Sequence, residues 1–265
     1  MATPVAVTIA GSDSGGGAGI QADLKTFSAL GVYGACVIAA LTAQNTKGVF
    51  AVHQVPADFI TAQIEAVFSD FAIGAVKIGM LGNRAAIEAV AAGIERHQAR
   101  NVVLDPVMAA TSGEKLLNSD ALDALRKLIA HANVLTPNLP EAAALLNELP
   151  ARDEGEMLKQ AERLLEFGTD AVLIKGGHGG GPDSVDLLVE PAGYTRFSAP
   201  RIETSDGHGT GCSLASAIAA GLAKGYLLGE AVGEAKTYVA DALAAADRLG
   251  TGSGRRPVHH FFKWW

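Results

Sequence analysis

The sequence predicts an α/β fold of three layers, in which helices cover both faces of a central, mostly parallel sheet. Short apolar runs rich in Val and Ile alternate with longer segments whose apolar residues recur at helical spacing. The short runs are apolar at nearly every position, as expected for parallel strands buried on both faces. Of the 265 residues 49% are hydrophobic, enough for one continuous core, and we expect residues 1–265 to form a single domain.

Six short apolar segments are the predicted strands of the parallel part of the sheet. They cover residues 5–10, 36–41, 75–78, 102–104, 134–136 and 171–174. Two further segments, 185–189 and 194–197, are separated by Glu-Pro-Ala-Gly, which favours a hairpin. Because a hairpin pairs antiparallel strands, we expect a mixed sheet.

Helices are predicted where apolar residues recur every three or four positions. Spacing of this kind marks residues 60–68, 87–94 and 157–165. Asn83 is placed to cap the second of these helices, and Gly31 to end an earlier helix in the left-handed conformation. Two closing helices are expected over about 212–224 and about 229–249, and the aromatic tail 261–265 is expected to pack on the domain or against a second subunit.

Charge and cysteine content exclude several classes of protein. The net charge is −7, and no run of basic residues exceeds Arg255 and Arg256, so nucleic acid is not an expected partner. The two cysteines, Cys36 and Cys212, fit neither a disulfide framework nor a paired zinc pattern, which favours a reducing compartment. No stretch approaches the roughly 18 apolar residues of a membrane span and no leader pattern is present, so we expect a cytoplasmic protein.

The first candidate site segment is the glycine-rich loop 11–19, GSDSGGGAG, between a predicted strand and a predicted helix. Such a loop lets a ligand approach the backbone closely. It does not match the dinucleotide fingerprint, because after Gly15 and Gly17 the third glycine would fall at Ile20, and no Walker lysine follows. A ligand-binding loop and a purely structural turn both remain open.

The second candidate segment is 206–212, DGHGTGC, which leads into a helix of small residues. Glycines before a helix N-terminus leave amide donors free at the positive end of the helix dipole, which suits a phosphoryl group during transfer. Cys212 lies in the first turn, where the pKa of a thiol tends to be depressed, and it could act as a base. The alternative is a small buried side chain that fills space.

Polar side chains follow three further predicted strands. Asp105 and Lys175 each end a strand, and Asn138 and Glu141 follow another. Ligands of open α/β sheets bind at this end of the strands. Two carboxylates and a carboxamide suit a hydrated magnesium ion, and a lysine suits a phosphate. Each residue alone also has a structural explanation, as a helix cap, a helix-terminal charge or a surface residue, but their collection at one edge favours a site.

Two polar residues near the first loop are candidate substrate contacts. Gln44 follows the predicted strand 36–41, and its primary amide offers a paired donor and acceptor to the edge of a heteroaromatic ring. Asp23 lies on the first helix, one turn past the loop, and could accept a hydrogen bond from a substrate hydroxyl or amine. An ordinary acidic residue in the first turns of a helix is the alternative for Asp23.

These segments together resemble the family of hydroxymethylpyrimidine and phosphomethylpyrimidine kinases, in the ribokinase-like superfamily. The resemblance covers nearly the whole chain in order, and it implies a ribokinase-like three-layer α/β/α sandwich. It is carried by the motifs at residues 10–26, 41–46, 77–81, 104–108, 136–142, 175–178 and 208–212.

The resemblance implies a role for each candidate residue of the substrate and transfer sites. The pyrimidine pocket would be lined by Gly11, Asp23, Gln44, Met80 and Val107. Gln44 and Asp23 would make its polar contacts. The phosphoryl-transfer site would consist of the base Cys212, the anion hole of Gly209, Thr210 and Gly211, and Lys175 on the ATP phosphates.

The resemblance also implies the nucleotide and metal sites. ATP would be bound by Lys175, Asn138, Glu141 and His208. Magnesium would be held by Asp105 and Glu141, with Asn138 assisting. Residues 109–115, with Thr111-Ser112-Gly113, would form a flap that excludes water during transfer.

Members of this family phosphorylate the hydroxymethyl group and then the monophosphate, with one ATP each time, in thiamine biosynthesis. The resemblance further implies a homodimer. Two positions depart from the family pattern: Gly207 stands where a Thr is usual, which removes a side-chain contact to nucleotide or phosphate, and residues 254–257 lack the usual glycine and histidine pattern, which we interpret as drift.

Three alternatives remain open. A pyridoxal or pyridoxine kinase of the same superfamily would act on a similar hydroxymethyl heteroaromatic, although Gln44 and Met80 favour the pyrimidine. A non-catalytic nucleotide-binding module would not need Asp105, Glu141, Lys175 and Cys212 together, and this chain has all four. A nicotinamide-dependent dehydrogenase is disfavoured by the broken fingerprint.

Overall fold

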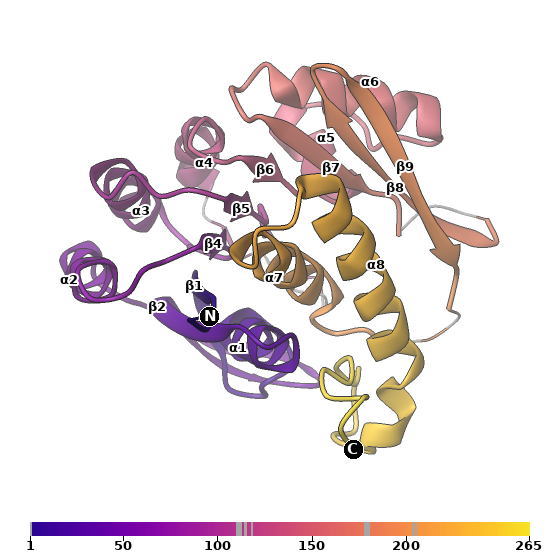
Figure 1. Cartoon of the computed structure of the whole chain (residues 1–265), viewed down its shortest axis with the longest axis horizontal. Helices are drawn as coiled ribbons and strands as arrows, with labels where there is room; N and C mark the ends of the chain where they lie inside the picture. Colours follow the sequence, from indigo (N-terminus) through magenta and orange to yellow (C-terminus); the bar gives the residue numbers. More distant parts are fainter. Residues whose placement is uncertain are drawn as a thin grey trace.

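The computed structural model describes residues 2–109, 113, 116, 117, 119–177, 181–202, 204 and 206–265. Within these residues, one sheet of nine strands carries helices on both faces (Figure 1). The elements in chain order are β1 (Val5–Asp13), α1 (Gly19–Ala29), β2 (Tyr33–Asn45), β3 (Gly48–Gln54), α2 (Ala57–Phe68), β4 (Ala75–Ile78), α3 (Arg84–Arg96), β5 (Val102–Leu104), α4 (Leu122–Ile129), β6 (Val134–Leu135), α5 (Leu139–Leu146), α6 (Glu154–Leu165), β7 (Ala171–Lys175), β8 (Asp183–Glu190), β9 (Gly193–Pro200), α7 (Thr210–Ala223) and α8 (Leu228–Ala244).

The sheet has the order β3-β2-β1-β4-β5-β6-β7-β8-β9. The six central strands, β2, β1, β4, β5, β6 and β7, pair in parallel with one another. The outer strands β3, β8 and β9 pair antiparallel. This confirms the predicted mixed, mostly parallel sheet and the predicted hairpin. The chain leaves β1 toward β2 on one side and returns to β4 on the other, and ligands of such sheets bind where the strand order reverses in this way.

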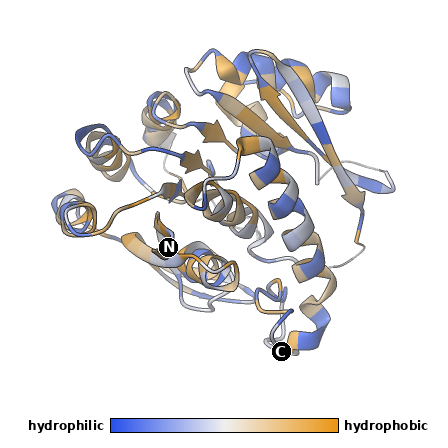
Figure 2. Cartoon of the chain, viewed as in Figure 1, coloured by the Kyte–Doolittle hydropathy of each residue, from blue (hydrophilic) through white to orange (hydrophobic). Residues whose placement is uncertain are grey.

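Helices α2 to α6 cover one face of the sheet, and α1, α7 and α8 cover the other (Figure 1). Side chains alternate along the strands, so that on β1 Val7 and Ile9 pack toward the first layer and Ala6 toward the second. Figure 2 shows apolar strands between helices whose outer faces are hydrophilic. Helix α7 is buried along most of its length, which explains its small residues: α1, α8 and the sheet all pack closely around it.

Both predicted helix termini are confirmed. The Asn83 side chain accepts a hydrogen bond from the Ala86 amide at 2.9 Å and caps α3, and Gly31 follows α1 with a left-handed φ of 73°. The unpredicted strand β3 pairs with a β2 that is longer than the predicted 36–41. No helix in the described ranges has both the length and the apolar character needed to cross a bilayer.

The C-terminal segment packs against the second glycine loop. The carbonyl oxygen of Arg256 accepts hydrogen bonds from the amides of Gly207 at 3.0 Å and His208 at 3.2 Å, and the amide of Arg255 donates to the carbonyl oxygen of Thr46 at 2.9 Å. These residues therefore join the β2–β3 turn to the second loop through backbone groups, which residues of other types could supply as well. The predicted packing of the aromatic tail is only partial, because Trp264 and Trp265 are exposed.

His260 is buried in this segment, and its imidazole Nε2 lies 3.0 Å from the Ser213 hydroxyl of α7. Burial, with the charges of Lys25 and His259, lowers the pKa of His260 to about 3. The unfolded chain binds a proton below its ordinary pKa of 6.5, whereas the folded chain does not, so stability is lost as the pH falls from about 6.5 toward 3.

His260→Gln is therefore expected to reduce the acid sensitivity of the fold. His260 lowers the free energy of unfolding by about 2 kcal/mol between about pH 7.5 and about pH 5, and glutamine, which does not titrate, removes that contribution. Urea unfolding at the two pH values measures it, with the exposed His53→Gln as the matched control. An equal pH dependence in all three proteins would contradict the prediction.

Candidate active site

A cavity of about 760 Å³ lies at the C-terminal ends of the parallel strands and is lined by both glycine loops. The structure brings together in its wall these predicted site residues: Gly11, Gln44, Met80, Asp105, Val107, Asn138, Glu141, Lys175, His208, Gly209, Thr210, Gly211 and Cys212. Asp23 is the predicted residue that does not line it. The predicted flap lies largely outside the described residues, since these omit Ala110, Thr111, Ser112, Glu114 and Lys115.

The second glycine loop ends at the N-terminus of α7. Gly209 is its N-cap, with a left-handed φ of 83°, and the first amide bonded back into the helix is that of Ser213. Within the described part of the chain, the amides of Gly211 and Cys212 have no hydrogen-bond acceptor. Free amide donors at the positive end of a helix are the expected features of an anion site.

Charged side chains lie close to Gly211. A Cβ built on Gly211 would lie 3.4 Å from the Lys175 ammonium nitrogen and 3.8 Å from the Asp105 carboxylate oxygen Oδ2. Glycine at 211 therefore leaves open the point at which the helix start, an ammonium and a carboxylate meet. A phosphoryl group fits this point, because both the lysine and the amides can donate hydrogen bonds to its oxygens.

Gly209→Ala is expected to disrupt this loop. A Cβ on Gly209 would overlap the Gly17 carbonyl oxygen of the first loop, and alanine is strained at its φ of 83°. We expect unfolding to become easier by more than ~2 kcal/mol and ATP binding to weaken by about 10-fold or more. Calorimetric titration with ATP and urea unfolding measure both effects.

The matched control for that variant is Gly225→Ala. Gly225 has a similar φ of 88°, but its Cβ would meet no atom within 4 Å, so only the backbone strain of about 1 kcal/mol remains. Equal effects of the two variants would contradict the role given to the contact between the loops.

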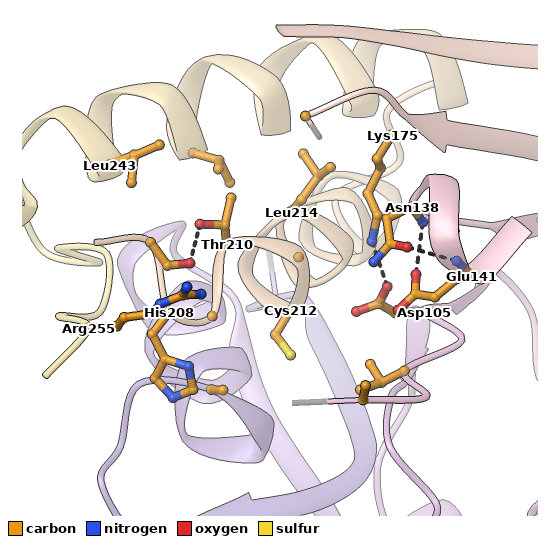
Figure 3. A pocket seen from close by; sticks show the side chains of 18 of the residues that line it. Asp105, Asn138, Glu141, Lys175, His208, Thr210, Cys212, Leu214, Leu243 and Arg255 are labelled. Carbon is orange, nitrogen blue, oxygen red and sulfur yellow. Dashed lines mark hydrogen bonds and ion pairs between the residues drawn. The ribbon is translucent and has the colours of Figure 1, made fainter. Parts of the chain in front are cut away.

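Lys175, Asp105 and Glu141 form a charged cluster on one side of the cavity (Figure 3). The Lys175 ammonium lies 2.8 Å from Asp105 Oδ1. Burial opposes the charge of Lys175, but Asp105 and Glu141 outweigh it and raise the lysine pKa above its ordinary value. Burial raises the pKa of Glu141 to about 7 against the opposing charge of Lys175, and the charge of Asp105 adds to that rise.

Asn138 and Glu141 also cap α5. The Asn138 side-chain oxygen accepts from the Glu141 amide at 2.9 Å, and Glu141 Oε2 accepts from the Asn138 amide at 2.8 Å, which is a capping box. Asn138 therefore acts as a helix cap and Glu141 as a charge at the helix N-terminus, which are the structural alternatives to a ligand contact that the sequence left open. Since the Asn138 oxygen is used in the cap, its amide NH₂ is the group that remains available to a ligand.

The oxygen atoms of this cluster fit magnesium in part. Asp105 Oδ2 and Glu141 Oε1 make no hydrogen bond within the described ranges, and hard carboxylate oxygens are the ligands that Mg²⁺ prefers. No group of three or more His, Cys, Asp or Glu side chains that could hold a metal is present among the described residues. A magnesium ion here would therefore depend on water and phosphate oxygens for the rest of its ligands.

Cys212 lines the cavity, and in Figure 3 its side chain lies between His208 on one side and Asp105 on the other. Burial raises the pKa of its thiol to about 11, with Lys77 opposing this shift and Asp23 and Asp105 adding to it. The expectation of a depressed thiol pKa at this helix start is therefore wrong, because desolvation outweighs the helix amides and the nearby ammonium. The thiol is neutral at rest, and a base at this position needs further stabilisation of its thiolate.

The structure also corrects the expected ligand contact of Asp23. Its side chain is completely buried and pairs with Lys77, whose ammonium lies 2.9 Å from Oδ2. The hydroxyls of Thr8 and Ser216 donate to the same carboxylate at 2.6 and 2.7 Å. These bonds occupy Asp23, and Lys77 lines the cavity in its place.

Sequence reasoning missed Lys77 and Asp13. Lys77 stands in the otherwise apolar strand β4, and a lone lysine in a buried strand is a signal for a buried partner. The Asp13 carboxylate accepts hydrogen bonds from the amides of Gly15, Gly17 and Ala18. Asp13 thus consumes donors of the first glycine loop, so the second loop is the better anion site.

Apolar groups form the wall opposite the charged cluster. Gly11, Met80 and Val107 line it, and a Cβ on Gly11 would lie 2.7 Å from the Met80 sulfur. Gly11 therefore provides room where a side chain would meet the Met80 sulfur, and the pyrimidine pocket implied for these residues stays a prediction. Gln44 lines the cavity near His208, whose ring nitrogen Nε2 is 2.9 Å from Asp13 Oδ2.

Comparison with known proteins finds a matching family model, similar sequences and similar structures. The family model described as phosphomethylpyrimidine kinase matches residues 13–259. A hydroxymethylpyrimidine/phosphomethylpyrimidine kinase from Rhizobium meliloti (strain 1021) is 58% identical over 264 residues, with 99% of each chain covered. The structure of a phosphomethylpyrimidine kinase from Clostridium difficile 630 is 44% identical with a TM-score of 0.80, covering 90% of this chain and 98% of the other. A Bacillus subtilis pyridoxal kinase, solved as an ADP complex, is 34% identical with a TM-score of 0.90, covering 98% of both.

Proposed function

Because the chain belongs to the phosphomethylpyrimidine kinase family, we propose that it uses ATP to phosphorylate hydroxymethylpyrimidine and then the resulting monophosphate, in thiamine biosynthesis. One observation carries the proposal: Gly211 and Cys212, whose amides have no acceptor among the described residues, line the same cavity as Lys175, and a Cβ built on Gly211 would lie 3.4 Å from the Lys175 ammonium. A γ-phosphoryl group held there faces the substrate hydroxyl across a short distance, and positioning of this kind supplies much of the catalysis of phosphoryl transfer.

ATP is the proposed donor, and the cavity has room for it. Beyond Lys175 the cavity continues along β9 and α8, where Pro200, Lys236 and Leu243 line it. The nucleotide base and ribose would occupy that part, with the phosphates toward α7. In the transfer the substrate oxygen forms a bond to the γ-phosphorus while the bond to the ADP oxygen breaks.

Magnesium would be held by Asp105 and Glu141 through the oxygens that their other contacts leave available. When bound, the ion neutralises charge that develops on the phosphates. The ammonium of Lys175 would neutralise the same negative charge on the phosphates. Asn138 would donate a hydrogen bond to the phosphates from its NH₂ group.

Cys212 is the proposed acceptor of the proton that the substrate hydroxyl loses. Its amide belongs to the anion site, so its side chain starts within reach of the transferred group. The buried ammonium of Lys77 opposes the rise of the thiol pKa and thus stabilises the thiolate. Gly209 and Thr210 would fix the loop conformation that orients the amides of Gly211 and Cys212 toward the phosphoryl group.

A homodimer and a cytoplasmic location stay predictions. The surface of β2 and β3 supports the first of them, because Leu41, Phe50 and Val52 expose 44%, 68% and 41% of their area along an unpaired sheet edge. A second copy of this chain would cover that apolar edge.

Pyridoxal kinase activity is the second candidate, since a pyridoxal kinase has the same fold with a TM-score of 0.90. ADP release by the purified protein with ATP and magnesium separates the candidates, when hydroxymethylpyrimidine, its monophosphate and pyridoxine are offered one at a time. Turnover of both pyrimidines with little turnover of pyridoxine supports the proposal. Turnover of pyridoxine alone would make the pyrimidine assignment wrong.

A further inference from the structure

We propose that the Asp13–His208 pair acts as a positioning device that fixes the orientation of the Gln44 carboxamide, and through it the preference of the pocket for a pyrimidine. The proposal rests on the function proposed above. Asp13, Gln44 and His208 come from three separate parts of the sequence and all line the cavity. Figure 3 shows His208 on the opposite side of Cys212 from the Lys175 cluster, so the pair is separate from the charged cluster.

The proton on His208 Nε2 follows from its partner. Asp13 Oδ2 lies 2.9 Å from Nε2 and also accepts from the amides of Gly17 and Ala18. Burial alone would raise the pKa of Asp13, but the hydrogen bonds of His208 and Ala18 outweigh it, and the pKa lies below its ordinary value. Asp13 is therefore a carboxylate at neutral pH and can only accept, so Nε2 of His208 carries a hydrogen.

That hydrogen determines which end of the Gln44 amide faces the imidazole. The Gln44 amide nitrogen is placed 3.3 Å from His208 Nε2, and the oxygen and nitrogen of a carboxamide have to be assigned from their hydrogen-bond partners. Since Nε2–H donates, an NH₂ group cannot donate to it, and the carboxamide is favoured with its oxygen toward His208. A half-turn about the last side-chain bond exchanges the oxygen and nitrogen of a carboxamide, so the surrounding hydrogen bonds decide between the two orientations.

A second neighbour independently gives the same orientation. The Thr42 hydroxyl donates its one hydrogen to the Ser12 carbonyl oxygen at 2.8 Å. Its oxygen lies 3.1 Å from the Gln44 oxygen Oε1, but with its hydrogen donated to Ser12 the hydroxyl can only accept at this contact, which favours an exchange of the amide oxygen and nitrogen. The amide nitrogen therefore belongs on the Thr42 side, in agreement with the requirement of His208.

The oriented amide presents a fixed pattern to a ligand. Its oxygen keeps one lone pair and its nitrogen one hydrogen for the cavity, which complements a pyrimidine edge that has an amino donor beside a ring nitrogen. The opposite orientation would leave two donors facing each other at His208 and would reverse the pattern. Gly17 permits the arrangement, because a Cβ there would lie 2.5 Å from the His208 ring carbon Cδ2.

A double-mutant cycle tests the coupling between His208 and Gln44. His208→Phe keeps a ring of similar size but removes the donor, and Gln44→Ala removes the amide. We expect each single variant to lower kcat/KM for hydroxymethylpyrimidine by about 10-fold, and the double variant to be no worse than Gln44→Ala alone. Losses that multiply to about 100-fold in the double variant would overturn the proposal. His208→Gln, which retains a donor, should recover part of the loss, and failure to recover any of it counts against the proposal.

The protonation of His208 is tested without any activity measurement. Long-range proton–nitrogen correlation spectra of the ¹⁵N-labelled wild-type protein distinguish the imidazole nitrogens, and the signal that disappears in His208→Phe assigns the residue. Hydrogen on Nε2 supports the proposal, and a bare Nε2 overturns it. If wild-type protein does not turn over hydroxymethylpyrimidine, the proposed function fails, while the spectrum still decides the state of the Asp13–His208 pair.

Discussion

Replacing Cys212 with alanine is expected to lower the turnover number by about 100-fold or more, while the dissociation constant for ATP changes little. The thiol is the side chain at the α7 N-terminus that can accept the substrate proton, and alanine keeps the backbone amide that contributes to the anion site. Turnover is measured as ADP release and binding by calorimetry. Unchanged turnover would remove the proposed role of Cys212.

The pH profile adds a readout that a structural role of Cys212 does not predict. Burial raises the thiol pKa to about 11, so the thiolate fraction increases with pH over the whole range in which the protein is handled. For the wild type we expect kcat/KM to rise between about pH 7 and about pH 9, and for Cys212→Ala we expect that rise to disappear. Cys36→Ala is the matched control, because Cys36 is the other free cysteine and lies outside the cavity wall.

Asp23→Asn is expected to cost about 3–5 kcal/mol of stability. The ammonium of Lys77 is completely buried, and Asp23 supplies its opposite charge at 2.9 Å. Burial opposes the charge on Lys77, but the carboxylate outweighs it and holds the lysine pKa above its ordinary value. With asparagine the ammonium must either stay buried without a counter-charge or lose its proton.

Urea unfolding at about pH 7 measures this loss of stability, and two further variants serve as comparisons. Asp23→Asn combined with Lys77→Met removes both charges and should recover part of the stability. Glu65→Gln breaks the ion pair of Glu65 with Arg96, both of which are largely exposed, and should cost less than about 1 kcal/mol. A loss in Asp23→Asn no greater than in Glu65→Gln would contradict the role of the buried pair.

Strand positions could be predicted from the sequence because continuous apolar runs mark buried parallel strands. The bounds of β4 and β5 agree with the predicted 75–78 and 102–104. β3 was not predicted although residues 49–52 form a short apolar run, because the strand lies at the sheet edge with most of its residues exposed, and so short a run alone does not distinguish an edge strand from a loop. The site residues at strand ends were predictable because the topology brings those ends together.

The remaining features depend on contacts that no local pattern contains. His208 and Asp13 are 195 residues apart in sequence, and a histidine in a glycine loop gives no indication of its partner. Asp23 has a suitable place for a ligand contact on its helix, but the position of Lys77 in three dimensions determines that its carboxylate is used internally. The pKa of Cys212 likewise depends on how deeply the thiol is buried, whereas its place at a helix start indicates the opposite shift.

The hydrogen bonds of Arg255 and Arg256 have a consequence for synthesis of the chain. A nascent polypeptide emerges with its N-terminus first at roughly 5–20 residues per second, so on the order of ten seconds or more separate the appearance of the first glycine loop from that of residue 256. Until then the amides of Gly207 and His208 lack the carbonyl oxygen that holds them, and Thr46 lacks its partner. A chain that ends shortly before residue 254 would therefore contain every candidate catalytic side chain but lack the hydrogen bonds that hold the second loop and the β2–β3 turn.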